Sequence, residues 1–184
     1  MKKTLPIFLA SALIVIIALV MLDYSGFLKI GLFKNNQYLG RVDYLSYAFD
    51  YSRKLEIQGE DNFLQITRPE YQGENRPLIQ IAFYKNGEFN DTEPFDNLLD
   101  WYTDYNYGNI EGREIQEIGW LDAKALKVEY SFDSGNDIIK STFNYAFSPD
   151  KSYVVGIIYD SPSKFSGALE SEYKEIVESF KFIK

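Results

Sequence analysis

The stretch EYKEIVESFKFIK, residues 172–184, closes the chain and decides the fold. It carries apolar side chains at helical spacing, which predicts an amphipathic helix: Tyr173, Ile176, Val177 and Phe180. The final FKF alternates apolar and charged residues, which predicts a short extended segment with Phe180 and Phe182 inward and Lys181 outward. A helix with one apolar face must bury it, so we expect this helix to pack across a sheet.

The sheet is predicted by period-two alternation from Arg41 onward. Apolar residues alternate in this way in several runs: Leu45, Tyr47, Phe49 and Tyr51; Ile79, Ile81 and Phe83; Leu126, Val128, Tyr130 and Phe132. Short polar connections at 131–139 and 148–152 favour antiparallel neighbours. Residues 153–159 are apolar on both faces of their strand, which predicts a central strand covered on both sides.

Two helices are expected to supply that cover. The first is predicted over 92–108, with Asp91 or Thr92 as N-cap and Gly108 as the stop. The second is predicted to begin near Ser161 and Pro162 and to continue into the terminal stretch. The fold class is therefore α+β, with a central antiparallel β-sheet sandwiched by helices.

Four stretches give this order of elements a family resemblance: YAFDYSRKLEI (47–57), WLDAKALKVEYSF (120–132), YVVGIIYDSPSKFSGAL (153–169) and EYKEIVESFKF (172–182). Across residues 42–183 the chain resembles the PsbP-like family, which includes bacterial membrane-anchored proteins of unassigned role. The resemblance implies a PsbP-like α/β/α sandwich. It carries over no functional residues, because the metal sites suggested for some members use histidine.

The N-terminal end carries an uncharged run from Leu5 to Leu22 after two lysines. As a helix this run would span roughly 27 Å, close to the thickness of a bilayer core. A cleaved secretory signal is the alternative, but its apolar region is shorter and ends at small residues. We therefore predict one N-terminal transmembrane helix, a signal-anchor over 1–24, a juxtamembrane linker over 25–40 and an extracytoplasmic domain over 41–184.

Composition excludes several classes of function. The chain has no Cys and no His, which removes thiol and histidine nucleophile systems and most zinc sites. Its net charge is −8, and residues after the apolar run carry 17 basic and 27 acidic side chains, or −10. A phosphate backbone would repel such a domain, so no nucleic-acid partner is expected. No cofactor is predicted.

Three groups of residues are candidate sites. Asp96, Asp100 and Asp104 are spaced to form a carboxylate stripe on the first helix, read either as a solvated face or as a weak cation site. Trp101, Tyr105 and Tyr107 could form a ligand or partner surface, or core. Carboxylate pairs for hydrolysis could come from Glu88, Asp91 or Glu93 with Asp133 or Asp137, although DSGND (133–137) is typical of a hairpin turn.

The sequence thus predicts a non-catalytic domain held at the cell membrane by residues 5–22, single-pass, with the domain outside the cytoplasm. We expect it to bind an unknown protein or small-molecule partner. The first alternative is a carboxylate-based hydrolase or cation-binding enzyme. The second is a structural envelope component.

Overall fold

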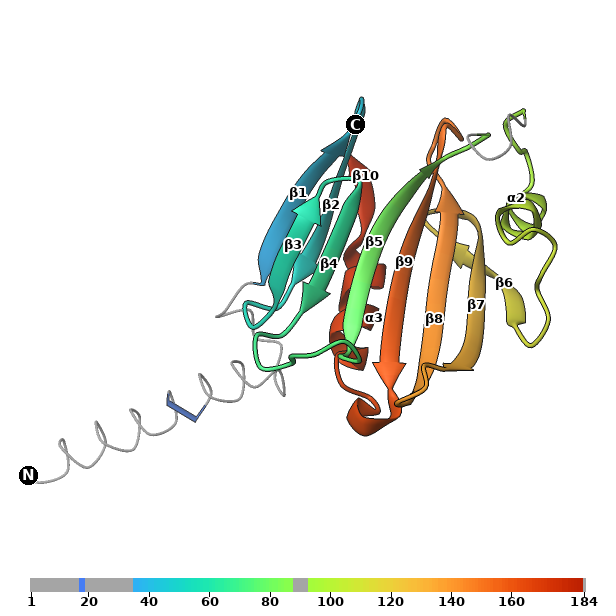
Figure 1. The fold of residues 1–184 in the computed structure, drawn as a ribbon. Helices are drawn as coiled ribbons and strands as arrows, with labels where there is room; N and C mark the ends of the chain where they lie inside the picture. Colours follow the sequence, from blue (N-terminus) through green and yellow to red (C-terminus); the bar gives the residue numbers. More distant parts are fainter. Residues whose placement is uncertain (1–16, 19–34, 88–92, 184) are drawn as a thin grey trace, which may run out of the picture. The chain divides into compact units, whose positions relative to one another are not determined.

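The computed structural model describes residues 17–18, 35–87 and 93–183, and its larger compact unit begins at Asn36. In that unit the chain forms two antiparallel sheets and two α-helices (Figure 1). The strands are β1 (Asn36–Val42), β2 (Leu45–Tyr51), β3 (Glu56–Glu60), β4 (Phe63–Thr67), β5 (Leu78–Lys85), β6 (Glu114–Trp120), β7 (Ala123–Asp133), β8 (Ile138–Phe147), β9 (Tyr153–Pro162) and β10 (Lys181–Ile183). The helices are α2 (Leu98–Tyr105) and α3 (Glu170–Ser179).

The larger sheet has seven strands in the order β3-β4-β5-β9-β8-β7-β6. All its described neighbours are antiparallel. Strand β9 lies in the middle, and every residue from Tyr153 to Tyr159 is buried. The prediction of a central strand covered on both faces is therefore confirmed.

The smaller sheet has three strands in the order β1-β2-β10. Tyr47 on β2 lies opposite Gly40 on β1 and Phe182 on β10. The ring of Tyr47 lies where a Cβ at Gly40 would stand, so only glycine fits there. The prediction of a single central sheet is wrong, because β2 and the terminal segment pair with each other and not with the larger sheet. The linker predicted over 25–40 is wrong for residues 36–40, which form most of β1.

The two faces of the larger sheet are covered by different elements. One core joins Val155, Ile157 and Tyr159 of β9 to Ile176 of α3 and to β2. The other core joins Val154 of β9 to α2 and to the side chains of β7 and β8 that point away from the first core. Because successive side chains of a strand point to opposite faces, α2 covers one face, and α3 with the small sheet covers the other. The predicted cover by helices on both sides is confirmed.

Both helices begin later than predicted. The N-cap of α2 is Asn97, whose side chain accepts a hydrogen bond from the Leu99 amide at 2.9 Å. The preceding segment cannot be helical because Phe95 is bound through both its N–H and its C=O to the buried side chain of Asn86.

Strand β9 continues to Pro162, which pairs with Ile139, and a 3-10 turn (Ser163–Phe165) follows. Leu169 then adopts a left-handed conformation, with φ of 66°, and α3 starts only at Glu170. The predicted terminal segment is confirmed, with Phe180 buried, Phe182 half-buried and Lys181 exposed.

Within the described residues, no helix has both the length and the apolar character needed to cross a membrane. The apolar run predicted to span the bilayer, residues 5–22, lies outside the described residues except for Ile17 and Ala18.

Candidate functional site

The predicted aromatic surface does not exist as one surface. Trp101 is 1% exposed and belongs to the core under α2. Tyr105 is half-buried and stacks on Trp101, with ring centroids 5.2 Å apart. Tyr107 lies beyond the helix, 82% exposed and with a left-handed φ of 52°. Tyr105 lines a cavity beside α2.

The acidic candidates are also separated. Asp96 precedes α2 and pairs with Lys151 at 2.9 Å, whereas Asp100 is exposed in the first turn of the helix. Asp104 is half-buried, and its Oδ2 has no hydrogen-bond partner in the described chain. No three acidic, histidine or cysteine side chains among the described residues lie close enough together to hold a metal ion.

The carboxylates considered for hydrolysis have structural contacts where the structure describes them. Asp133 accepts a hydrogen bond from the Gly135 amide at 2.7 Å inside the β7–β8 turn. Asp137 accepts bonds from Ser163 and from the Lys164 amide. The Ser163 hydroxyl is the main cause that lowers the pKa of Asp137. DSGND is therefore the predicted hairpin turn; Glu88 and Asp91 lie outside the described residues, and Glu93 is exposed.

A cleft of about 530 Å³ lies between α3 and the strands β6 to β9. We name it the α3 cleft, and its polar lining includes Lys127, Glu129, Lys140, Thr142, Asn144 and Lys174. These strand residues share one face of the sheet, since Lys127 pairs with Asn144 and Glu129 pairs with Thr142. On β9 the same face is apolar and lies in the core with α3. The cleft therefore opens where this face changes from apolar to polar.

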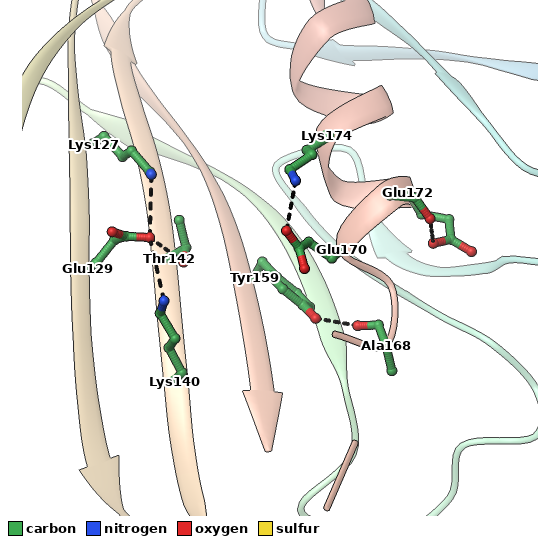
Figure 2. A network of polar contacts seen from close by, with 10 residues as sticks. Lys127, Glu129, Lys140, Thr142, Tyr159, Ala168, Glu170, Glu172 and Lys174 are labelled. Carbon is green, nitrogen blue, oxygen red and sulfur yellow. Dashed lines mark hydrogen bonds and ion pairs between the residues drawn. The ribbon is translucent and has the colours of Figure 1, made fainter. Parts of the chain in front are cut away.

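Two groups of charged side chains lie on either side of the α3 cleft (Figure 2). On the sheet, Glu129 pairs with Lys127 at 3.3 Å and with Lys140 at 4.0 Å, and it accepts a bond from Thr142. On the helix, Lys174 pairs with Glu170 at 2.7 Å. The lining holds three lysines and three glutamates, so it is balanced in charge although the chain is acidic.

Two polar atoms in the lining have no hydrogen-bond partner among the described residues: Asn144 Oδ1 and the Tyr173 hydroxyl. Both side chains are only 6% exposed. Burial, followed by the charge of Glu129, raises the pKa of Tyr173, so its hydroxyl stays protonated. Buried polar atoms in native proteins are almost always hydrogen-bonded, so these two are candidates to pair with a group that enters the cleft.

The helix that forms one wall is fixed by a buried ion pair. Glu172, 7% exposed, accepts a hydrogen bond from Arg68 and another from Ser171 at 2.8 Å. Burial by itself would raise the pKa of Glu172, but the bonds from Arg68 and Ser171 outweigh it and the pKa is lowered. Just before the start of α3, the Tyr159 hydroxyl donates to the Ala168 carbonyl. These contacts hold the N-terminal end of α3 against Arg68, which follows β4, and against β9.

A pH-dependent loss of stability is expected from this pair. The pKa of Glu172 is lower in the folded state, so its contribution is complete above the unfolded value of about 4.3. It is lost as the pH falls through the lower folded pKa. Glu172→Gln should lower the free energy of unfolding by about 1–3 kcal/mol at pH 7 and should flatten its decline below about pH 4.

Urea unfolding between pH 3 and pH 7 measures this difference. Glu170→Gln is the matched control, since Glu170 is in the same turn but its pair with Lys174 is exposed. The control should leave stability nearly unchanged, because an exposed ion pair contributes little. Equal effects of the two substitutions would contradict the role of the buried pair.

No protein-family model matches this chain, and a search of curated proteins found no match. Two solved structures are similar to it. LpqN of Mycobacterium tuberculosis, described as involved in cell envelope biogenesis, aligns with a TM-score of 0.58 at 10% identity. That alignment covers 81% of this chain and 91% of LpqN. A protein from Bacteroides thetaiotaomicron aligns with a TM-score of 0.54 at 10% identity, over 82% of this chain and 49% of its own.

The chain shares its fold with both proteins. The identity is too low to show more than the fold, and this chain spans about half of the Bacteroides protein. Membership of the PsbP-like family stays a prediction, because neither match is identified as a member of it.

Proposed function

We propose that this chain is a non-catalytic, extracytoplasmic domain of the cell envelope that binds a partner protein or small ligand in the α3 cleft. Residues 5–22 hold it in the membrane as a single-pass anchor. Two facts support this location. An uncharged run follows two lysines at the N-terminal end, and the fold is shared with LpqN, which is described as involved in cell envelope biogenesis.

The observation that carries the binding role is the pair of unpartnered atoms, Asn144 Oδ1 and the Tyr173 hydroxyl, in a cleft of about 530 Å³. Leaving a buried polar atom without a partner costs about 1–3 kcal/mol, so a ligand that pairs with both gains that energy on binding. The balanced lining neither attracts nor repels net charge. The expected ligand group is therefore polar, with no net charge.

Catalysis has little support from the same residues. The chain has no His and no Cys, the Asp133 side chain is used to close a turn, and that of Asp137 accepts a bond from Ser163. A purely structural envelope component would not need polar atoms without hydrogen-bond partners in the lining of a cleft. Binding without chemistry accounts for these observations with the fewest assumptions.

A single-cysteine experiment tests location and binding together, because the chain has no cysteine of its own. Ile138→Cys places a thiol at the rim of the α3 cleft, where Ile138 is 59% exposed. Leu39→Cys is the control, since Leu39 is 66% exposed on β1 and does not line the cleft. Cells with opened outer barriers and an intact cytoplasmic membrane are treated with a membrane-impermeant maleimide that carries a photo-crosslinker, and then irradiated.

Both variants should be labelled, and only I138C should give a discrete crosslinked product. Failure to label either variant would overturn the extracytoplasmic location. Labelling without a product specific to I138C would overturn binding in the α3 cleft and would favour the structural alternative.

A further inference from the structure

A second cavity, of about 330 Å³, lies beside α2 on the face of the larger sheet opposite the α3 cleft. The opposite orientation follows from the strands, since Ser141, Phe143 and Tyr145 of β8 line it while Thr142 and Asn144 line the cleft. Its volume is near the lower end of the range for small-molecule sites, about 300–1,000 Å³. We name it the tyrosine pocket, after five tyrosines in its lining: Tyr84, Tyr102, Tyr105, Tyr130 and Tyr145.

The walls of the tyrosine pocket are aromatic and held in place by one another. Tyr84 lies 5.2 Å from Tyr105, and Tyr102 lies 5.5 Å from Tyr145, measured between ring centroids. Tyr130 stacks on Phe143 at 5.4 Å with an interplanar angle of 12°. A set of rings at these distances presents flat apolar surfaces, which suit a planar ligand.

One side of the pocket carries a cation, Arg113, that has no counter-ion among the described residues. The Arg113 guanidinium lies 5.1 Å from the centroid of the Tyr130 ring and 5.7 Å from that of Tyr102. Its Nη1 donates to the Tyr102 hydroxyl at 2.7 Å and to Asn106 Oδ1. In the described part of the chain, no carboxylate pairs with Arg113, and its Nε and Nη2 have no hydrogen-bond partner.

That arrangement is unusual for a chain with a net charge of −8. If Arg113 served only to tie α2 to β6, the bonds from Nη1 would suffice. The remaining donors of a guanidinium form a planar fork that matches a carboxylate. They are available to a ligand in the pocket.

Another part of the lining carries a carboxyl group kept from water. Asp160 accepts a bond from the Ser141 hydroxyl, but burial outweighs that bond and raises the pKa of Asp160. Tyr130 interacts with both charges: burial raises the pKa of its hydroxyl, Arg113 lowers it and Asp160 raises it. A desolvated carboxyl costs stability, and it offers a partner to a polar substituent of a ligand.

We propose that the tyrosine pocket binds a small planar carboxylic acid, with its carboxylate on Arg113, its ring against the tyrosines and a polar substituent toward Asp160. This site is independent of the α3 cleft and of the function proposed for it, because the two lie on opposite faces of the sheet. The pocket supplies two groups that fix the orientation of a flat ligand, Arg113 and Asp160.

The test titrates the full chain in detergent micelles with 4-hydroxybenzoate, followed by saturation-transfer NMR on the probe. Two further probes each lack one feature: 4-hydroxybenzyl alcohol has no carboxylate, and acetate has no ring. Saturable binding is expected for 4-hydroxybenzoate, with an affinity at least about tenfold above that of either other probe, because each loses a charge-assisted bond or the ring contacts. Equal binding of the alcohol, or no saturable binding of 4-hydroxybenzoate, would overturn the proposal.

Variants then locate the site. Arg113→Gln should weaken binding of 4-hydroxybenzoate by at least about tenfold. Arg53→Gln, at an exposed arginine outside the pocket, and Lys140→Gln, in the α3 cleft, should leave it unchanged. Unchanged binding in the Arg113 variant would overturn the proposal, and the comparison of probes on the unaltered chain remains decisive if that variant does not fold.

Discussion

Replacing Phe180 by alanine should lower the free energy of unfolding by about 3–5 kcal/mol, a large share of the roughly 5–15 kcal/mol that holds a domain folded. Phe180 is 3% exposed and lies between the two sheets. Its ring centroid is 5.5 Å from that of Tyr47 on β2, 5.9 Å from Trp120 on β6 and 6.4 Å from Phe83 on β5. Alanine would leave a cavity where both sheets meet the end of α3.

Urea unfolding of the full chain in micelles, followed by tryptophan fluorescence, measures this loss, and Trp120 reports directly on the Phe180 contact. Ile183→Ala is the matched control, since Ile183 is on the adjoining strand β10 and is 41% exposed. The control should cost less than about 1 kcal/mol. A loss below that value for Phe180→Ala would mean that the end of the chain is not packed in the core.

The burial of Phe180 could be predicted from the sequence because it depends on local spacing alone. The helical periodicity before Phe180 and the alternation after it both place its side chain on the apolar face of the segment. In the structure that face is the buried one. The central position of β9 could be predicted for the same reason, since apolar residues on both faces require cover on both sides.

The division into two sheets could not be predicted in this way. Tyr47 and Phe49 on β2 alternate just as Ile79 and Ile81 on β5 do, and alternation does not say which strands pair. Strand β2 pairs with β10, about 135 residues later in the chain, and such pairing is decided by tertiary packing.

Both helices were predicted to start too early, because residues that are typical of a helix start precede the observed first turn. Thr92 and Pro94 fit a helix start, but the Asn86 side chain holds Phe95 in a non-helical segment. Leu169 ends the turn before α3 in a left-handed conformation that leucine seldom adopts, so nothing local predicts it.

Neither cavity could be predicted from the sequence. Lys127, Glu129 and Lys140 read as outward-facing strand residues, and only the fold shows that α3 stands beside them as a wall. Arg113 lies at the start of the alternating run GREIQEIGW (112–120), and nothing in the sequence marks it as a pocket residue. Its place among the tyrosines depends on how α2 packs over β7 and β8.

Replacing Trp101 by alanine should also cost about 3–5 kcal/mol, and it decides between the two interpretations of the aromatic arc on α2. Trp101 is 1% exposed, with ring centroids 5.7 Å from Tyr84 and 5.5 Å from Tyr145. If Trp101 is a core residue, its replacement lowers stability with no ligand present. If Trp101 is a stacking surface for a ligand, its replacement lowers the affinity for that ligand and changes stability little.

Two further substitutions make the Trp101 result specific. Leu99→Ala, on the same helix but 37% exposed, should cost less than about 1.5 kcal/mol. Trp101→Phe should cost less than Trp101→Ala, because it keeps a ring in place and removes an indole N–H that has no partner within the described chain. If Trp101→Ala instead left the urea midpoint unchanged, α2 would not be packed on the larger sheet, and the tyrosine pocket that this packing closes would lose one of its walls.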